Sequence, residues 1–275
     1  MKIAIQGQAA SFHDIASRKY FGDDIDIIPC ETFKETFKQL SDGITDTAVV
    51  AIENSLYGPI NPVYDLLLEK QAWVSGEVYL RIEHCLIGMP DSQMEKIKEV
   101  HSQVMAIAQC EGWLENHLPQ ATHIEQSDTT GSVALVKTWT DPTKAAIASA
   151  QAARIHKMKI LARNIEDHHQ NFTRFFVLNR DRKDVKDCDK TSIIIHTTAD
   201  TKPGVLHRAL GVFADREINI YSLHSRPTVG KAWHYMFYLD IAIGVNNPIF
   251  NEIIKELDSQ DCHVDILGSY KNGIG

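Results

Sequence analysis

Four polar loops in the sequence each follow a predicted strand and lead into a predicted helix. The loops are Gly7–Ser11, Glu53–Ser55, the short connection at Ser102, and Gln126–Thr130. The turn Gly58-Pro59 follows the second of them. In open α/β sheets ligands bind beyond the carboxyl ends of the strands, where the first N–H groups of a helix can hold a carboxylate. Helix capping alone explains Ser, Thr and Asp at such positions. Capping does not explain the polar run before Gly58-Pro59, so the loops predict a site for an anionic ligand.

Composition and charge exclude several other functions. The 275 residues are 44% hydrophobic and 23% charged, as in ordinary globular proteins. The net charge is −8 and there is no basic run, so a nucleic-acid partner is not expected. No apolar stretch approaches the roughly 18–20 residues of a membrane span. The odd number of widely spaced cysteines fits reduced thiols and a cytoplasmic location; they are Cys30, Cys85, Cys110, Cys188 and Cys262.

Motifs for bound cofactors and metals are missing. The sequence has no G-x-G-x-x-G, no Walker loop, no G-x-S-x-G and no H-E-x-x-H. The densest histidine cluster, Asp167-His168-His169, consists of chain neighbours whose side chains point apart, which favours a solvated pair over a metal site. The sequence therefore predicts chemistry without a cofactor and without a metal.

Strand and helix patterns alternate over the first two-thirds of the chain, which predicts parallel sheets with crossover helices, and the number of strands allows two α/β lobes. The predicted strands are Lys2–Gln6, Ile25–Cys30, Thr47–Ile52, Glu77–Gly88, Glu99–His101, Ala121–Glu125, Ala145–Ile147, Lys159–Ala162 and Phe172–Asn179. The predicted helices are Phe12–Phe21, Thr32–Leu40, Asn61–Lys70, Val104–His117, Gly131–Thr138 and Ala150–His156.

A polar segment, Asn179–Lys190, has no apolar period and predicts a solvated linker. Beyond it the predicted order is strand, helix, strand, strand, helix, strand, which is the ferredoxin-like βαββαβ unit. The predicted elements are Thr191–Thr198, Pro203–Arg216, Asn219–Ser225, Ala232–Ile243, Pro248–Asp258 and Cys262–Tyr270.

Several motifs, in order along nearly the whole chain, resemble those of prephenate dehydratases. Asn171–Phe175 carries N-x-T-R-F, Ile52–Ser55 reads I-E-N-S, and Ser102–Cys110 resembles S-H-P-Q-A-L-A-Q-C. Thr129-Thr130 stands where the family has S-T. The tail resembles an ACT domain, with Pro203–Leu206 at its G-A-L motif and His224–Pro227 at its E-S-R-P motif.

The chain departs from the family pattern at two places that bear on function. Gln8–His13 stands where the family has E-P-G-A-Y-S, so that His13 occupies a serine position. His224 replaces the acid of E-S-R-P. The second departure bears on inhibitor binding more than on catalysis.

The resemblance implies a lyase that converts prephenate to phenylpyruvate in phenylalanine biosynthesis, with loss of CO₂ and of the ring hydroxyl as water, and with no cofactor. It implies a catalytic domain over residues 1–181, with two α/β lobes of parallel or mixed sheets around a central cleft. The chain would cross to the second lobe near residue 75 and return near residue 163, and an ACT domain would follow over 190–275. Phenylalanine is the implied allosteric effector, and a homodimer or homotetramer is the implied assembly. Because the chain opens on a strand of the catalytic part, a fused chorismate mutase region is not expected.

By resemblance, Thr173 is the hydrogen-bond donor to the leaving hydroxyl. Phe175 shares its strand face and would contact the substrate ring. Arg174 either clamps a carboxylate or forms a structural ion pair on the other face. Glu53 would orient a donor or hold a proton, because a bare carboxylate repels a dianion. The other expected substrate-binding residues are Asn54, Ser55, Ser102, Gln109, Thr129 and Thr130, with Ser102 and Gln109 predicted on one face of one helix.

The expected effector residues of the ACT domain are Gly204, Val205, Leu206, Asn219, Ser225, Arg226 and Pro227. Two alternatives to the predicted activity stay open. The same enzyme class could act on arogenate, whose amino group replaces the keto group. A non-catalytic binding protein, such as an amino-acid sensor built on the ACT domain, would leave the T-R-F motif unexplained.

Overall fold

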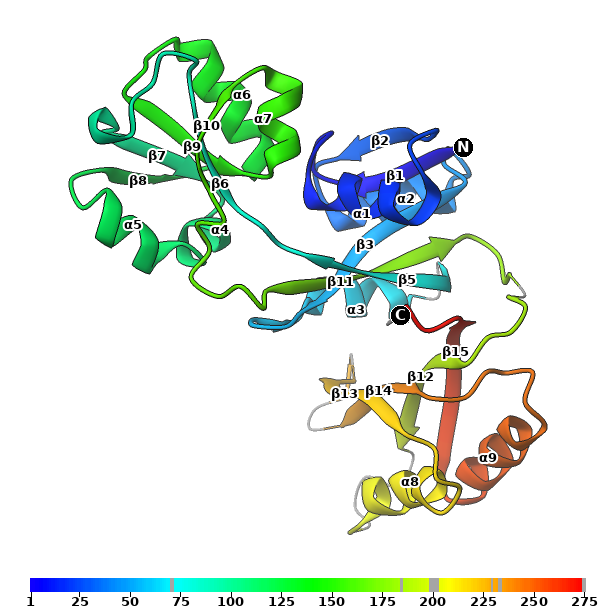
Figure 1. Ribbon diagram of the computed structural model, residues 1–275. Helices are drawn as coiled ribbons and strands as arrows, with labels where there is room; N and C mark the ends of the chain where they lie inside the picture. Colours follow the sequence, from blue (N-terminus) through cyan, green and yellow to red (C-terminus); the bar gives the residue numbers. More distant parts are fainter. Residues whose placement is uncertain (70–71, 184, 198–202, 229, 232–233, 274–275) are drawn as a thin grey trace. The chain divides into compact units, whose positions relative to one another are not determined.

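The computed structural model describes residues 1–69, 72–183, 185–197, 203–228, 230–231 and 234–273. It divides into two compact units (Figure 1). The first comprises Met1–Val63 and Tyr79–Phe175, and the second comprises Tyr64–Val78 and Phe176–Gly275. Each unit is therefore built from two separate stretches of the chain.

The first sheet of the first unit is centred on a buried parallel strand. β1 (Lys2–Gln6) pairs in parallel with β2 (Asp26–Cys30) and with β3 (Thr47–Asn54). The short β4 (Gly58–Pro59) pairs antiparallel with β3, and β11 (Phe172–Asn179) lies beside β3. α1 (Phe12–Phe21) and α2 (Phe33–Ser41) are the crossover helices. The nearly continuous apolar sequence of β3 suits a strand covered on both faces.

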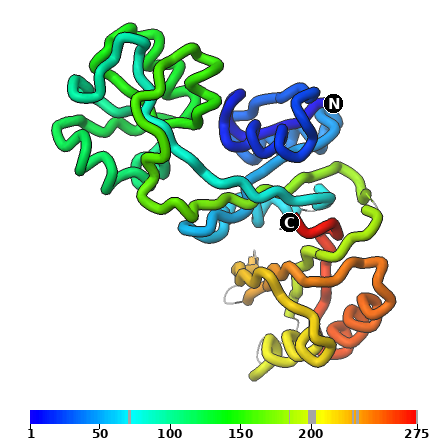
Figure 2. The backbone as a smooth tube through the Cα atoms, in the orientation of Figure 1, coloured from blue at the N-terminus to red at the C-terminus, as the bar shows by residue number. Residues whose placement is uncertain are grey.

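The second sheet of this unit is mixed, in the order β10-β6-β9-β7-β8. β7 runs parallel to β8 and β9, and β6 runs antiparallel to β9 and β10. Two connecting segments, residues 82–84 and 164–171, join this lobe to the first (Figure 2). The elements are β6 (Cys85–Gly88), η1 (Met94–Lys96), β7 (Glu99–Ser102), α4 (Val104–Ala108), α5 (Glu111–His117), β8 (Thr122–Glu125), α6 (Thr129–Trp139), β9 (Lys144–Ala148), α7 (Ala150–His156) and β10 (Lys159–Arg163).

The second unit contains a sheet ordered β13-β14-β12-β15-β5. Its elements are β5 (Trp73–Arg81), β12 (Lys190–Thr197), α8 (Val205–Ala214), β13 (Ile220–Pro227), β14 (Tyr235–Ile241), α9 (Pro248–Ser259) and β15 (Cys262–Tyr270). Phe213 of α8 and Phe250 of α9 are buried against this sheet. α3 (Asn61–Leu68) passes from the first unit into the second.

The βαββαβ order of the tail and the two α/β lobes are confirmed. The ends of two tail strands predicted at Thr198 and Ala232 lie outside the described residues. None of the helices in the described part of the chain is long and apolar enough to span a bilayer.

Two predicted elements are each divided in the structure. The predicted strand Glu77–Gly88 is split into β5 and β6, because residues 82–84 leave the first sheet and the carboxylate of Glu166 accepts the His84 N–H at 2.9 Å. The predicted helix Val104–His117 is split into α4 and α5. The Asp167 carboxylate accepts the N–H groups of Gly112 and Trp113, at 2.9 and 2.8 Å, and starts α5 as a new helix.

Candidate active site

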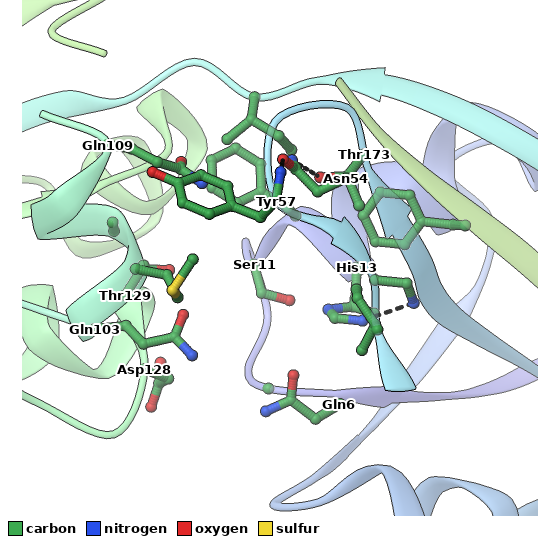
Figure 3. Close-up of a pocket in the computed structure, with 18 of the residues that line it drawn as sticks. Gln6, Ser11, His13, Asn54, Tyr57, Gln103, Gln109, Asp128, Thr129 and Thr173 are labelled. Atoms are coloured by element: carbon green, nitrogen blue, oxygen red, sulfur yellow. Dashed lines mark hydrogen bonds between the residues drawn. The ribbon is translucent and has the colours of Figure 1, made fainter. Parts of the chain in front are cut away.

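A cavity of about 480 Å³ lies in the first unit, lined by residues of both lobes (Figure 3). The first lobe contributes the loop behind β1 with the start of α1, and the ends of β3 and β11. The second lobe contributes α4 and the start of α6. The polar side chains that line the cavity are Gln6, Ser11, His13, Asn54, Tyr57, His84, Gln103, Gln109, Asp128, Thr129 and Thr173.

Asn54 at the end of β3 uses all of its hydrogen-bonding capacity inside the protein. Its Oδ1 accepts the backbone N–H groups of Leu56 and Tyr57 at 2.9 and 3.1 Å, which fixes the orientation of the amide. Its Nδ2 donates to Asn171 Oδ1 at 2.8 Å and to Thr173 Oγ1 at 3.0 Å. Because Thr173 Oγ1 accepts this bond, the hydroxyl proton of Thr173 is left to point elsewhere. Asn54 therefore positions Thr173 as a donor at the cavity wall.

Asn171 extends this network to the second lobe. Its Nδ2 donates to Gln109 Oε1 at 3.0 Å, and Nε2 of His84 lies 2.7 Å from the same oxygen. Since an amide oxygen only accepts, His84 Nε2 carries a proton and Gln109 is oriented with its NH₂ group away from these two partners. Burial lowers the pKa of His84, so the ring is neutral. Gln109 thereby offers an amide donor to the cavity.

The cavity provides neutral donors rather than cations. No Lys or Arg is among the described residues that line it. The N-terminal turns of α1 and α6 lie at its wall, where Ser11 and Asp128 are the N-cap residues. Helix N-termini and amide N–H groups bind carboxylates without adding a full positive charge. The arrangement suits a small anionic ligand that accepts a hydrogen bond from Thr173.

Comparison with known proteins gives the family. The family model described as prephenate dehydratase matches residues 3–183, and the model described as ACT domain matches residues 191–259. The chain belongs to the prephenate dehydratase family. Its relatives include a "Bifunctional chorismate mutase/prephenate dehydratase" of Aquifex aeolicus, 34% identical over 100% of this chain and 74% of that protein. They also include "Arogenate dehydratase/prephenate dehydratase 1, chloroplastic" of Arabidopsis thaliana, 34% identical over 98% of this chain and 72% of that protein.

Solved structures with the same fold match the whole chain. A prephenate dehydratase of Arthrobacter aurescens in complex with L-Phe is 27% identical and superimposes with a TM-score of 0.89 over 99% of this chain and 90% of that chain. A protein described as "GqqA- a novel type of quorum quenching acylases" is 30% identical, with a TM-score of 0.88 over 98% of each chain. The fold class predicted for a prephenate dehydratase with an ACT domain is confirmed.

Five of the residues predicted for the prephenate dehydratase site line the cavity: Asn54, Gln109, Thr129, Thr173 and Phe175. Thr173 and Phe175 share one face of β11, as predicted. Gln109 reaches the cavity from the break between α4 and α5 rather than from a continuous helix face shared with Ser102. Ser102 is at the end of β7, fully buried, and donates to the Ile147 carbonyl at 2.7 Å.

The other predicted residues lie outside the cavity wall. Arg174 Nη1 lies 3.6 Å from Glu53 Oε2, so these side chains form an ion pair between β11 and β3. Of the two orientations considered for Arg174, the structure has the ion pair. Ser55 Oγ donates to the Gln170 carbonyl and accepts the Phe172 N–H, which ties the end of β3 to the start of β11. Thr130 is buried beside Thr129 but does not line the cavity.

The predicted effector residues lie in the second unit, around β13 and the start of α8. Gly204 has a φ of +79° and precedes α8, and Val205 is buried in the core. The Asn219 carbonyl accepts the Ala242 N–H. Arg226 Nη2 contacts both carboxylate oxygens of Asp65, at 2.7 and 2.8 Å. Leu206 lies on α8, and Ser225 and Pro227 lie on β13.

Sequence reasoning missed the part of the site that depends on contacts between distant segments. Asn171 was expected only as the first residue of the N-x-T-R-F motif and was given no role, yet its side chain connects Asn54 to Gln109. His13 was noted only as a departure from the family pattern, and His84 carried no signal at all. The one available sign was the polar loop behind β1, which does reach the cavity through Gly7 and Ser11.

Proposed function

We propose that this chain converts prephenate to phenylpyruvate and that its ACT domain makes the reaction sensitive to phenylalanine. The observation that carries the proposal is the Asn54–Thr173 hydrogen bond at the wall of a cavity with neutral donors. It leaves the Thr173 proton available for a leaving oxygen. The relatives and the family models agree with this activity.

In this reaction the bond from the ring to its carboxylate breaks and releases CO₂. The electron pair of that bond enters the ring, the bond from the ring to the hydroxyl breaks, and the hydroxyl leaves as water after gaining a proton. Thr173 donates a hydrogen bond to the leaving oxygen while negative charge develops there. Because the hydroxyl of threonine is a poor acid, hydrogen bonding contributes more than full proton transfer. Aromatisation of the ring supplies the driving force.

The remaining roles follow from placement. Gln109 and Thr129 are proposed to bind substrate oxygen atoms, and Phe175 to contact the substrate ring. Asn54 holds Thr173 in place. Glu53 on β3 and Arg174 on β11 are proposed to hold these two strands together as an ion pair and not to contact the substrate.

We also propose domain boundaries, an oligomeric assembly and a cellular location for this chain. The catalytic part is assigned to residues 1–181 and the ACT domain to 190–275. The assembly is proposed to be a homodimer or homotetramer that binds phenylalanine through its ACT domains. Binding of phenylalanine is supported by the Arthrobacter aurescens relative, which was solved in complex with L-Phe. A cytoplasmic location is proposed because the five cysteines are free thiols.

The deciding experiment is incubation of the purified full chain with prephenate and, separately, with arogenate. Phenylpyruvate from prephenate at the higher kcat/KM supports the proposal, whereas phenylalanine from arogenate at the higher kcat/KM favours the related dehydratase activity. No product from either substrate would contradict the proposed enzyme class. Sedimentation of the same sample with and without phenylalanine tests the assembly.

A further inference from the structure

His13 is the second residue of α1, and its ring forms part of the cavity wall. The ring is held between two aromatic side chains. Its centroid lies 5.1 Å from that of Phe175, edge to face, and 5.8 Å from that of Phe33. Phe175 is two residues beyond Thr173 on β11, so His13 stands on the same side of the cavity as Thr173. The aromatic packing fixes the plane of the ring.

One backbone hydrogen bond sets the tautomer of this ring. The Ala51 N–H of β3 points at Nε2 of His13, at a distance of 3.2 Å. A backbone N–H can only donate, so Nε2 must present its lone pair. In the neutral ring the proton is therefore on Nδ1. The edge of the ring turned away from Ala51 faces Ser11 and the cavity (Figure 3).

The proton on Nδ1 is available to a ligand. Across the residues that the structure describes, Nδ1 of His13 has no hydrogen-bond partner. Burial lowers the pKa of His13 to about 4, so the ring stays neutral near pH 7. His13 thus supplies a directed N–H group without a positive charge, like the amide donors around it.

The surroundings of His13 favour an anionic acceptor. Ser11, the N-cap of α1, lines the cavity next to His13 in the first turn of this ten-residue helix. The N-terminus of a helix favours negative charge. A carboxylate placed there would meet both the helix terminus and the Nδ1–H group of His13.

We propose that Nδ1–H of His13 donates a hydrogen bond to a carboxylate oxygen of bound prephenate, with the Ala51 N–H as the group that fixes the tautomer. This inference rests on the proposed function. It adds a substrate-binding residue at a position where the family pattern has serine, so that an imidazole rather than a hydroxyl makes the contact in this chain.

Two variants of the full chain separate the two ring nitrogens. In His13→Asn the amide NH₂ lies near the position of Nδ1, so the donor to the cavity is kept and the acceptor for Ala51 is lost. In His13→Gln the amide lies near the position of Nε2, so the acceptor for Ala51 is kept and the donor to the cavity is lost. We expect His13→Gln to lower kcat/KM for prephenate about tenfold, mainly through a higher KM, the scale of one hydrogen bond to a charged group. His13→Asn should stay within about threefold of wild type.

Equal losses in both variants would assign His13 a structural role and overturn the inference, as would a His13→Gln enzyme with wild-type KM. A wild-type chain that fails to convert prephenate overturns the proposed function instead. Nitrogen-15 NMR of the wild-type chain gives a readout that does not depend on turnover. The histidine signal that disappears in His13→Asn should show a protonated Nδ1 and an unprotonated Nε2 at pH 7. The opposite tautomer or a doubly protonated ring overturns the inference.

Discussion

The two units of this chain differ in how far the polar side chains around their cavities are paired within the protein. In the first unit, a cavity of about 480 Å³ is lined by several polar side chains, and of these Thr173, Gln109 and His13 keep a donor for a ligand after their internal bonds are made. In the second unit, the space beside Ser222 and His224 measures only about 10 Å³, enough for one water molecule at most. Its polar atoms are paired with one another. Ser222 Oγ lies 2.8 Å from His224 Nε2, and Tyr238 donates its hydroxyl proton to the Tyr64 carbonyl at 2.9 Å.

The difference indicates where each ligand can bind without rearrangement. The catalytic cavity is already formed, which favours catalysis by positioning. Among the predicted effector residues, Arg226 is engaged within the chain, by the carboxylate of Asp65. Phenylalanine must therefore either compete with an internal partner or use surface outside this cluster. Any inhibition then requires tighter binding of the effector to a less active arrangement of the protein.

The largest effect is expected when the hydroxyl donor of Thr173 is removed from the cavity wall. Thr173→Ala should lower kcat by about 10²-fold or more, because the leaving oxygen loses its hydrogen bond when charge develops on it. KM should change less, since this bond strengthens mainly in the transition state. Thr173→Ser, which keeps the hydroxyl and the acceptor for Asn54, is the control and should retain more activity. Steady-state kinetics with prephenate measures both. Equal turnover by Thr173→Ala and wild type would remove Thr173 from the mechanism.

A smaller effect is expected when the side-chain amide of Asn171, which hydrogen-bonds to residues of both lobes, is removed. Asn171→Ala removes the acceptor for Asn54, in a buried hydrogen bond, and a donor to Gln109, in a partly buried one. We expect kcat/KM for prephenate to fall about tenfold and the free energy of unfolding to fall by about 1–3 kcal/mol, the cost of leaving buried polar groups unpaired.

Ser92→Ala is the matched control for Asn171→Ala. It removes a partly buried hydrogen bond in the same unit, from Ser92 Oγ to the Pro142 carbonyl at 2.9 Å, away from the cavity. It should cost stability without changing kcat/KM. If both variants lost stability and neither lost activity, the network would be structural and the cavity would not depend on it. Denaturant unfolding and kinetics on the same samples give the two quantities.

The fold was largely predictable because its signals are local. Alternating strand and helix patterns and the polar linker at 180–189 can be read within windows of a few residues. The division of Val104–His117 into two helices was not predictable in this way. Its cause is the carboxylate of Asp167, more than fifty positions further along the chain, which caps α5.

The candidate site was predictable only where a motif marked it. Asn54, Gln109 and Thr173 were expected from the motifs, and they do meet at one cavity. Their connection through Asn171 joins residues 117 positions apart and has no local signature. The role of His13 depends on a backbone N–H of another element, 38 positions away. Only the folded chain shows which ring nitrogen faces the cavity.

The smallest expected effect concerns the ion pair that occupies Arg226. Asp65 lies on α3, in the same unit as Arg226. The side chains of Asp65 and Arg226 are 50% and 23% exposed, so the pair contributes at most about 1 kcal/mol to stability.

Asp65→Asn should leave kcat/KM for prephenate within about twofold of wild type. It should lower the phenylalanine concentration for half-inhibition by about two- to fivefold, because Arg226 is then released to bind the effector carboxylate. Glu256→Gln breaks a comparable exposed pair with Arg216 in the same unit and should leave inhibition unchanged. Inhibition curves at fixed prephenate measure both variants, and the same half-inhibition concentration in Asp65→Asn and wild type would show that Arg226 does not bind phenylalanine in competition with Asp65.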